Sequence, residues 1–177
     1  MAVIALNPGH YPGIDPGAVG QNGLEEAKVN MAVATIAQAV LEENGHSVVL
    51  ISENELDAIA DDANLVEADA FVSIHCNSST SETAQGTETW CYEYSEHGYR
   101  LALEIQRELV DALQRPNRGI RYSSSFYVLK HTFMPAVLAE LAFISNAEEE
   151  KLLGDTLFQE SAGMAIARGI EAWLADY

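Results

Sequence analysis

The stretch AFVSIHCN, from Ala70 to Asn77, is short, apolar and β-branched, and it ends in a polar cluster. This pattern predicts a buried β-strand, because a strand that is covered on both faces is apolar at successive positions. In an open α/β sheet the carboxyl end of such a strand faces the crevice in which ligands bind. His75 is therefore predicted to lie at a functional edge of the sheet.

A single histidine at the end of a strand is more often a hydrogen-bonded structural residue than a ligand. Two other residues, however, stand in similar positions. His10 and Glu140 are each predicted to end a short apolar strand as well. Three such coincidences in a chain of this size favour a site at which strand ends converge.

Predicted strands and helices alternate along the chain. Strands are expected at residues 2–6, 47–52, 70–77, 86–94 (as an edge strand), 126–130 and, after Met134-Pro135, in the segment that ends at 144. Helices are expected from Glu25 or Glu26 to about Asn44, in part of 53–67, and at 96–113, 146–153 and 156–177. The alternation predicts an α/β protein, a three-layer α/β/α sandwich around a mostly parallel sheet of roughly six strands.

The composition excludes some classes of binding partner. The chain has 177 residues and a net charge of −18, which argues against nucleic acid and against anionic membranes as partners. No apolar run has transmembrane length, and the start of the chain lacks the pattern of a signal peptide. Two cysteines, Cys76 and Cys91, are too few for a disulfide framework. We expect one domain covering residues 1–177 and a monomer.

The basic residues are concentrated in one part of the chain. Five of the nine lie between Arg100 and Arg121, and residues 115–121 carry three of them. Such a segment could meet a carboxylate on a substrate, but a solvated loop is the more common role. We expect the solvated loop.

Glu140 is the single charged residue in segment 133–144. A buried carboxylate costs several kcal/mol unless it meets a cation or takes up a proton. Either outcome suits a general base beside a metal. Two histidines and one carboxylate, with a fourth position open to water, form a common catalytic zinc set. The HExxH spacing is absent, so His10, His75 and a glutamate of the first helix would have to converge from separate elements.

The glutamate could be either of two neighbours. The helical stripe of Val29, Val33, Ile36 and Val40, extended back by one turn, places both Glu25 and Glu26 near the buried side. Periodicity does not choose between them.

Short motifs along the whole chain occur in an order that is specific as a set, although each alone is weak. They are Asn7-Pro-Gly-His10, Asp15-Pro-Gly-Ala18, Gly23-Leu-Glu-Glu26 with Asn30, Ala63-Asn64 with Ala68-Asp69, Ser73-Ile-His-Cys-Asn77, Gly86-Thr-Glu88, Asn117-Arg-Gly119, Val128-Leu129 and Pro135-Ala-Val-Leu-Ala-Glu-Leu-Ala-Phe-Ile-Ser-Asn146. In these motifs the chain resembles the zinc-dependent N-acetylmuramoyl-L-alanine amidases of the type 3 family, which cut bacterial peptidoglycan. The resemblance also implies a fold like that of the zinc exopeptidases.

The resemblance implies a set of roles. It makes His10, Glu26 and His75 the ligands of one Zn²⁺ per chain, with Glu26 preferred because it lies four residues before Asn30. It makes Glu140 the catalytic residue. The chain departs from the family at Asn7, where an aspartate is usual, so an orienting contact to a zinc-binding histidine is expected to be altered.

Two other functions remain open besides hydrolysis of the bond between N-acetylmuramic acid and L-alanine. A zinc exopeptidase acting on ordinary peptides would need a site for a free terminus. A non-catalytic wall-binding homologue would be expected to have lost a ligand or Glu140, and the chain keeps them all. As an endolysin or autolysin, the protein is expected to act at the bacterial cell wall. It would reach the wall by lysis, by another route, or as a domain cut from a longer secreted protein.

Overall fold

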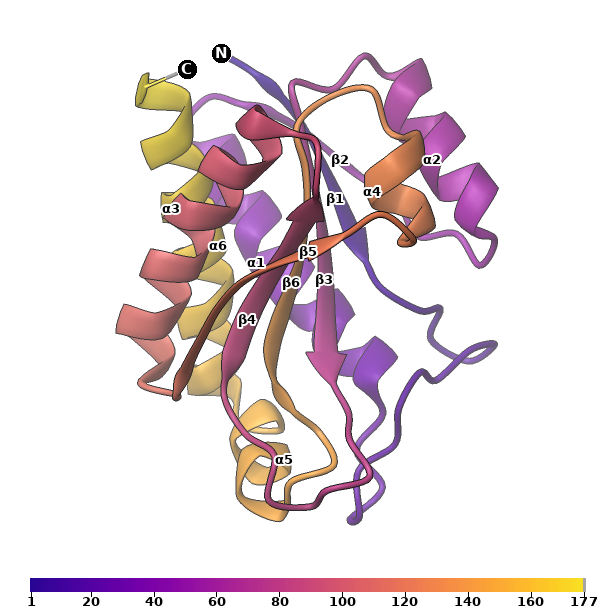
Figure 1. The fold of residues 1–177 in the computed structure, drawn as a ribbon, viewed down its shortest axis with the longest axis vertical. Helices are drawn as coiled ribbons and strands as arrows, with labels where there is room; N and C mark the ends of the chain where they lie inside the picture. The colour runs from indigo at the N-terminus through magenta and orange to yellow at the C-terminus, as the bar shows by residue number, and fades with distance from the viewer. Residues whose placement is uncertain (177) are drawn as a thin grey trace.

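The computed structural model describes residues 1–176 and contains one sheet with helices on both faces (Figure 1). The strands are β1 (Val3–Pro8), β2 (Ser47–Leu50), β3 (Ala70–Asn77), β4 (Thr87–Tyr92), β5 (Asn117–Ser123) and β6 (Ala136–Phe143). The helices are α1 (Glu26–Glu43), α2 (Leu56–Leu65), α3 (Glu96–Leu113), α4 (Tyr127–His131), α5 (Ala147–Leu153) and α6 (Thr156–Asp176). The expected end of the last helix, Tyr177, lies outside the described residues.

The sheet has the strand order β2-β1-β3-β6-β4-β5. Strands β2, β1, β3 and β6 run parallel to one another, whereas β4 is antiparallel to β6 and parallel to β5. The prediction of a mostly parallel, six-stranded α/β sandwich is confirmed. No helix within residues 1–176 is long and apolar enough to cross a membrane.

The two faces of the sheet are covered unequally. Helices α1, α3 and α6 pack over one face, where alternate residues of β3 such as Val72 and Ile74 join a large core (Figure 1). The short helices α2 and α4 cover the other face, where Phe71 and Leu138 belong to a smaller core. Since side chains alternate along a strand, His75 shares the second face with Phe71. This thinner layer is the one in which a site can stay open.

Capping helps to define two of the helices. Ser95 precedes α3, and its hydroxyl accepts a hydrogen bond from the backbone N–H of Gly98. Asn146 precedes α5, and its side-chain oxygen accepts from the N–H groups of Glu148 and Glu149. These contacts satisfy donors that the first turn of a helix leaves without partners. The helix starts predicted near residues 96 and 146 agree with these caps.

The strand predicted at residues 126–130 is wrong, because this segment forms helix α4. The Ser123 hydroxyl accepts hydrogen bonds from the N–H groups of Ser125 and Phe126 and turns the chain at that point. Val128 and Leu129 then pack into the smaller core. A short apolar run does not distinguish a strand from one turn of helix, and here tertiary packing decides.

The predictions for β4 and β5 are also corrected. Residues 87–92 do not form an edge strand, because β4 lies between β6 and β5. The edge is β5, in the basic segment that was expected to be a solvated loop. Charged residues and glycine weaken the strand pattern of Asn117–Ser123, yet both are tolerated in a strand that pairs on one side only.

Candidate metal centre and its surroundings

Three side chains from three separate elements meet at the carboxyl ends of β1 and β3. His10 follows β1, Glu26 begins α1 and His75 lies near the end of β3. The Nε2 atom of His10 lies 3.3 Å from Oε2 of Glu26, and Nδ1 of His75 lies 2.9 Å from Oε1 of Glu26. One ligand atom from each residue lies within 4.8 Å of the others. The structure therefore brings together all three of the predicted metal ligands.

Glu26 is the buried member of the cluster, with 3% of its surface exposed. Its carboxylate accepts hydrogen bonds from the N–H groups of Ala18 and Cys76. Desolvation opposes its ionisation, but the hydrogen bonds with His10 and His75 outweigh it and hold the pKa of Glu26 below its usual range. The site thus contains an ionised carboxylate, as a divalent cation requires.

Asp15 orients His10. Its carboxylate lies 2.7 Å from Nδ1 of His10, on the side of the ring opposite Glu26. Hydrogen bonds with Glu26 and, to a smaller degree, Asp15 raise the pKa of His10 to about 9, although burial opposes this. A metal-binding histidine usually donates its other ring N–H to such a carboxylate. Asp15 belongs to the Asp15-Pro-Gly-Ala18 motif, but the sequence alone predicts no role for it.

Two glycines leave room for the cluster. A Cβ atom at Gly9 would overlap the imidazole ring of His75. A Cβ atom at Gly17 would lie 2.6 Å from Cδ2 of His10 and 2.8 Å from Oε2 of Glu26. His10 itself has a φ of 65°, which is uncommon for a residue other than glycine. The backbone is therefore shaped around the three donors, and a His, His, carboxylate set fits zinc.

Two residues considered in the sequence lie outside the cluster. Glu25 forms an ion pair with Lys28 instead. Asn7 is buried, donates to the Ile51 carbonyl and accepts from the Ser73 hydroxyl. It forms no hydrogen bond with either candidate histidine, so the expected orienting contact from position 7 is not made, and Asp15 forms one with His10 instead.

Glu140 lies beside the cluster, directly opposite His75 in the β3–β6 register. The expectation that Glu140 ends its strand is wrong, because β6 continues to Phe143. Within residues 1–176 the Oε2 atom of Glu140 is buried and has no hydrogen-bond partner. Desolvation, with smaller contributions from the charges of Glu26 and Glu88, raises the pKa of Glu140 to about 8. A carboxyl group that has an oxygen without a partner and a pKa of about 8 is suited to accept a proton and to release it again.

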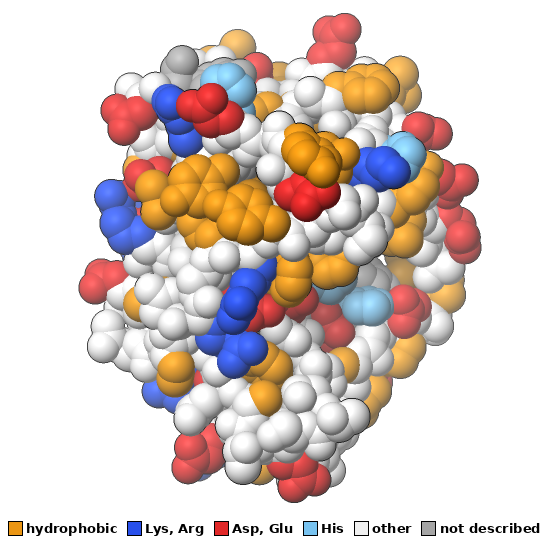
Figure 2. Space-filling model, viewed as in Figure 1, with side chains coloured by type: hydrophobic (Ala, Val, Ile, Leu, Met, Phe, Trp, Pro, Cys, Tyr) orange, Lys and Arg blue, Asp and Glu red, His pale blue; other side chains and the backbone are white. Residues whose placement is uncertain are grey.

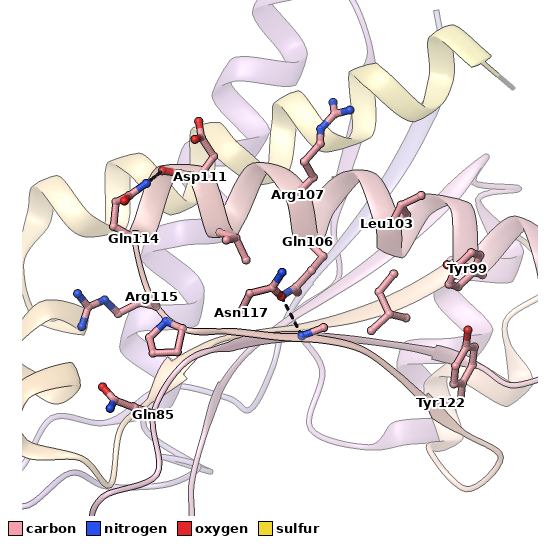
Figure 3. A pocket seen from close by; sticks show the side chains of 14 residues that line it. Gln85, Tyr99, Leu103, Gln106, Arg107, Asp111, Gln114, Arg115, Asn117 and Tyr122 are labelled. Carbon is pink, nitrogen blue, oxygen red and sulfur yellow. Dashed lines mark hydrogen bonds between the residues drawn. The ribbon is translucent and has the colours of Figure 1, made fainter.

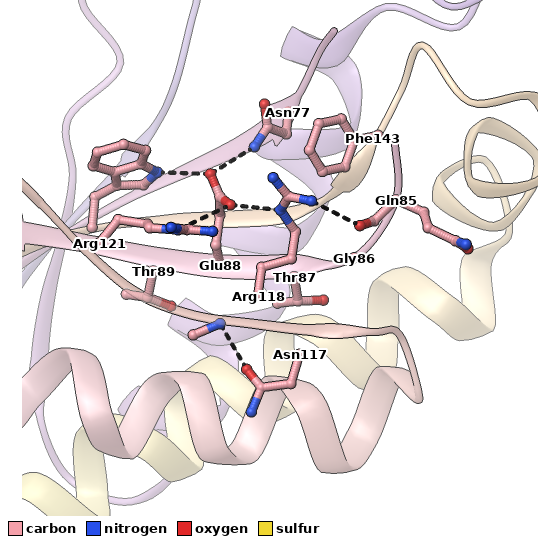
Figure 4. Close-up of polar contacts among 12 residues, drawn as sticks. Asn77, Gln85, Gly86, Thr87, Glu88, Thr89, Asn117, Arg118, Arg121 and Phe143 are labelled. Carbon is pink, nitrogen blue, oxygen red and sulfur yellow. Dashed lines mark hydrogen bonds and ion pairs between the residues drawn. The ribbon is translucent and has the colours of Figure 1, made fainter. Parts of the chain in front are cut away.

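A second polar cluster lies one strand further along the same face. Glu88 on β4 pairs with Glu140 across the β4–β6 register and is 4% exposed. Its carboxylate accepts hydrogen bonds from Asn77, Trp90 and Arg118, and the Nε atom of Arg121 lies 3.6 Å away (Figure 4). Sequence reasoning gave Glu88 no role and expected the arginines to be solvated.

Two cavities lie at different distances from these clusters. One, of about 340 Å³, opens beside His10 and His75 and is also lined by residues of α2 and α4. The larger, of about 980 Å³, lies between α3 and β5 (Figure 3). Its lining includes none of the three candidate metal ligands. We therefore place the chemistry at the smaller cavity, where the titratable groups converge.

The comparisons with known proteins agree with this geometry. Residues 4–172 match the profile of the N-acetylmuramoyl-L-alanine amidase family, Amidase_3. The chain is 40% identical to the uncharacterized protein YqiI of Bacillus subtilis, with 96% of this chain and 84% of that protein covered. It is 36% identical to the N-acetylmuramoyl-L-alanine amidase LytC of the same organism, over 94% of this chain but 34% of LytC.

Solved structures give the same result. The catalytic domain of CwlV, an N-acetylmuramoyl-L-alanine amidase from Bacillus (Paenibacillus) polymyxa var. colistinus, superposes with a TM-score of 0.93. It is 36% identical, and 99% of each chain is covered. The amidase AmiC2 of Nostoc punctiforme gives a TM-score of 0.92 at 33% identity, with 98% of this chain and 97% of that chain covered. On its sequence and its fold, this chain belongs to the N-acetylmuramoyl-L-alanine amidase family.

Proposed function

We propose that the protein hydrolyses the amide bond between N-acetylmuramic acid and L-alanine in bacterial peptidoglycan, with one zinc ion held by His10, Glu26 and His75. The convergence of these three side chains from separate elements is the observation that carries the proposal. The family to which the chain belongs supplies the reaction. The substrate places its site of action at the bacterial cell wall.

The roles of the residues follow from their positions. Bound zinc would supply a Lewis acid that polarises the scissile carbonyl and lowers the pKa of a water molecule. Glu140, which has a free carboxylate oxygen, takes the proton of the attacking water and passes it to the departing amine of L-alanine. Asp15 holds the ring of His10 so that Nε2 faces Glu26. The products are a glycan strand and a free stem peptide.

The direct test measures zinc content and catalysis in the same preparations. Purified peptidoglycan incubated with the protein should release new L-alanine amino termini, and a chelator should abolish this release until zinc is added back. Glu26→Ala should lower both the zinc content and the rate. Glu25→Ala is the matched control and should change neither, because Glu25 faces Lys28.

Two results would contradict the proposal. New termini that belong to residues other than L-alanine would indicate a peptidase that acts on ordinary peptides. Full zinc content in Glu26→Ala, with loss of zinc in Glu25→Ala, would mean that the metal is held by the other glutamate.

A further inference from the structure

The edge strand β5 presents two arginines on the face that contains Glu140. A register shift between Thr87 and Glu88 makes Gly119 the partner of Glu88, so that Arg118 is the extra residue of a bulge. Gly119 has a φ of 79°, and the Asn117 side chain accepts a hydrogen bond from its N–H group. Bulges of this kind redirect a side chain, often next to a functional site. Here the bulge brings Arg118 over Glu88.

Neighbouring elements hold this bulge in place. The side-chain amide of Gln106, on α3, donates to the Asn117 side chain and to the Thr87 carbonyl. Figure 3 shows Gln106 and Asn117 close together. Gly86 has a φ of 112°, and a Cβ atom there would overlap the carbonyl oxygen of Pro116. The start of β5 is therefore fixed against both α3 and β4.

Glu88 fixes the two guanidinium groups. Nε of Arg118 donates to Oε2 of Glu88 at 2.7 Å, and the Arg118 guanidinium lies 4.8 Å from the centre of the Phe143 ring (Figure 4). Nε of Arg121 lies 3.6 Å from the same oxygen. Both contacts to Glu88 use Nε, and within residues 1–176 the terminal nitrogens of Arg121 have no partner. Nη1 of Arg118 donates to the Gln85 carbonyl at 3.4 Å (Figure 4), so the terminal nitrogens of Arg121 and Nη2 of Arg118 are available to a ligand.

The cluster carries surplus positive charge. Two guanidinium groups face one carboxylate, in a chain whose net charge is −18. The Arg118 and Arg121 side chains are 35% and 46% exposed, whereas Glu88 is 5% exposed. Figure 2 shows basic side chains gathered near the middle of this face, with acidic and histidine side chains beside them. The arrangement suits an anionic group that approaches from solvent.

The side of the metal centre away from β5 carries acidic and apolar side chains instead of basic ones. The cavity beside His10 is lined by the acidic residues Asp15 and Glu53 together with apolar side chains of α2 and α4. A substrate that crosses the centre would therefore meet carboxylates on one side and arginines on the other. An anionic portion of that substrate is favoured on the β5 side, and an uncharged sugar is tolerated on the other.

The spacing fits a peptide whose carboxylate lies close to the scissile bond. Neighbouring strands are about 4.8 Å apart, so the guanidinium groups over Glu88 lie roughly one strand spacing from the strand of Glu140. An extended peptide advances about 3.5 Å per residue, so the second residue beyond the scissile bond can reach them. In peptidoglycan this residue is a D-glutamate joined through its side-chain carboxyl group. Its α-carboxyl group is left either free or amidated.

We infer that Arg118 and Arg121, held by Glu88, bind the free α-carboxylate of the second stem-peptide residue and thereby select non-amidated over amidated stems. This inference rests on the proposed function, since it assigns the leaving peptide to the β5 side of the site. Bidentate arginine recognition favours a carboxylate, whereas an amide of the same shape offers one oxygen and an NH₂ group that opposes the guanidinium donors.

The experiment compares two synthetic muramyl tetrapeptides that differ only in the free or amidated α-carboxyl group of the second residue. The wild-type protein should cleave the free acid with a kcat/KM about 10- to 100-fold higher, the range of a charge-assisted contact. In Arg121→Ala and in Arg118→Ala this preference should fall to within about 3-fold, through slower cleavage of the acid. The acid-to-amide ratio is measured within each variant, so partial misfolding does not move it.

Arg107→Ala is the matched control, because it removes the same charge from α3 on the other face of the sheet and should keep the full preference. Equal rates of the wild-type protein on the two peptides overturn the inference. So does an unchanged preference in both arginine variants, or a protein that is active on peptidoglycan but cleaves neither peptide. Failure to release L-alanine termini from peptidoglycan itself would instead contradict the proposed function.

Discussion

Glu140 and Glu88 face each other across β6 and β4, and their surroundings differ sharply. The Glu88 carboxylate has donors on both oxygens, from Asn77 and Trp90 on one and from the arginines of β5 on the other. The Glu140 carboxylate has a buried oxygen with no partner within residues 1–176. Two residues of the same type, adjacent on the same face, therefore have opposite hydrogen-bonding environments.

The difference shows that hydrogen-bond partners, and not residue type or burial alone, determine the separate roles of the two glutamates. Charge-assisted hydrogen bonds stabilise an ionised carboxylate and commit it to holding other groups. A carboxyl group left without such bonds keeps its proton to a higher pH and can exchange it. We therefore assign Glu88 to positioning and Glu140 to proton transfer.

The largest expected effect is on catalysis by Glu140→Gln. Loss of proton transfer should lower the rate on peptidoglycan by about 10²- to 10⁴-fold. The zinc content should stay at the wild-type level, because the proposed ligands are intact. Glu25→Gln is a control for the same chemical change. A zinc-free Glu140→Gln protein would make Glu140 a ligand, and a fully active one would remove it from the mechanism.

The second expected effect is on the pH dependence of folding. The pKa of Glu140 is raised from 4.5 to about 8 in the folded protein, mainly by desolvation. A carboxyl group with a raised pKa contributes stability that is present below about pH 4.5 and is lost as the pH rises through about 8. The metal-free wild-type protein should therefore lose stability over this interval, by at most about 1.4 kcal/mol per pH unit from this group.

Urea unfolding of chelator-treated protein between pH 5 and pH 9 measures this effect. Glu140→Gln cannot ionise at this position, so its stability relative to wild type should rise with pH. His10 and Glu26 titrate in both proteins, and their charges contribute to the pKa of Glu140, so the difference measures Glu140 together with its coupling to this pair. A constant difference between the two curves would show that Glu140 titrates at its ordinary value.

The sequence alone predicts the parallel half of the sheet better than the other half. β1, β3 and β6 are apolar runs of strand length, and each ends near a polar residue, so both the strands and the location of His10 and His75 are predictable. The sequence of β5 has no such apolar pattern. This segment becomes a strand through its pairing with β4 and its side-chain contacts, which a local pattern does not reveal. Its link from Arg118 to Glu88 joins residues that are 30 positions apart.

The same distinction applies to the candidate site. His10 and His75 are marked by their positions near strand ends and Glu140 by being the single charge in an apolar segment, but periodicity leaves Glu25 and Glu26 equivalent. Only the resemblance chooses Glu26, and the structure then shows it buried between the two histidines. Asp15 lies in a glycine- and proline-containing loop whose path no local pattern predicts, so its contact with His10 was not expected.

The smallest expected effect, and the sharpest in sign, is on the stability of Glu88→Gln. The glutamine oxygen can still accept from Asn77 and Trp90, but an amide replaces the carboxylate oxygen that faces Arg118 and Arg121. Two guanidinium groups are then left without a counter-charge. Because both are more than a third exposed, solvent screens part of the loss, and we expect destabilisation of about 1–2 kcal/mol.

Urea unfolding of Glu140→Gln and Glu88→Gln at pH 8 without metal tests the proposed difference between the two glutamates. Glu140→Gln should be at least as stable as wild type, because a desolvated carboxyl group becomes a neutral amide of similar size. Glu88→Gln should be less stable, because a carboxylate with several donors loses its charge. The two glutamines thus move the unfolding midpoint in opposite directions. A shift in the same direction for both would contradict the division of roles between the two carboxyl groups.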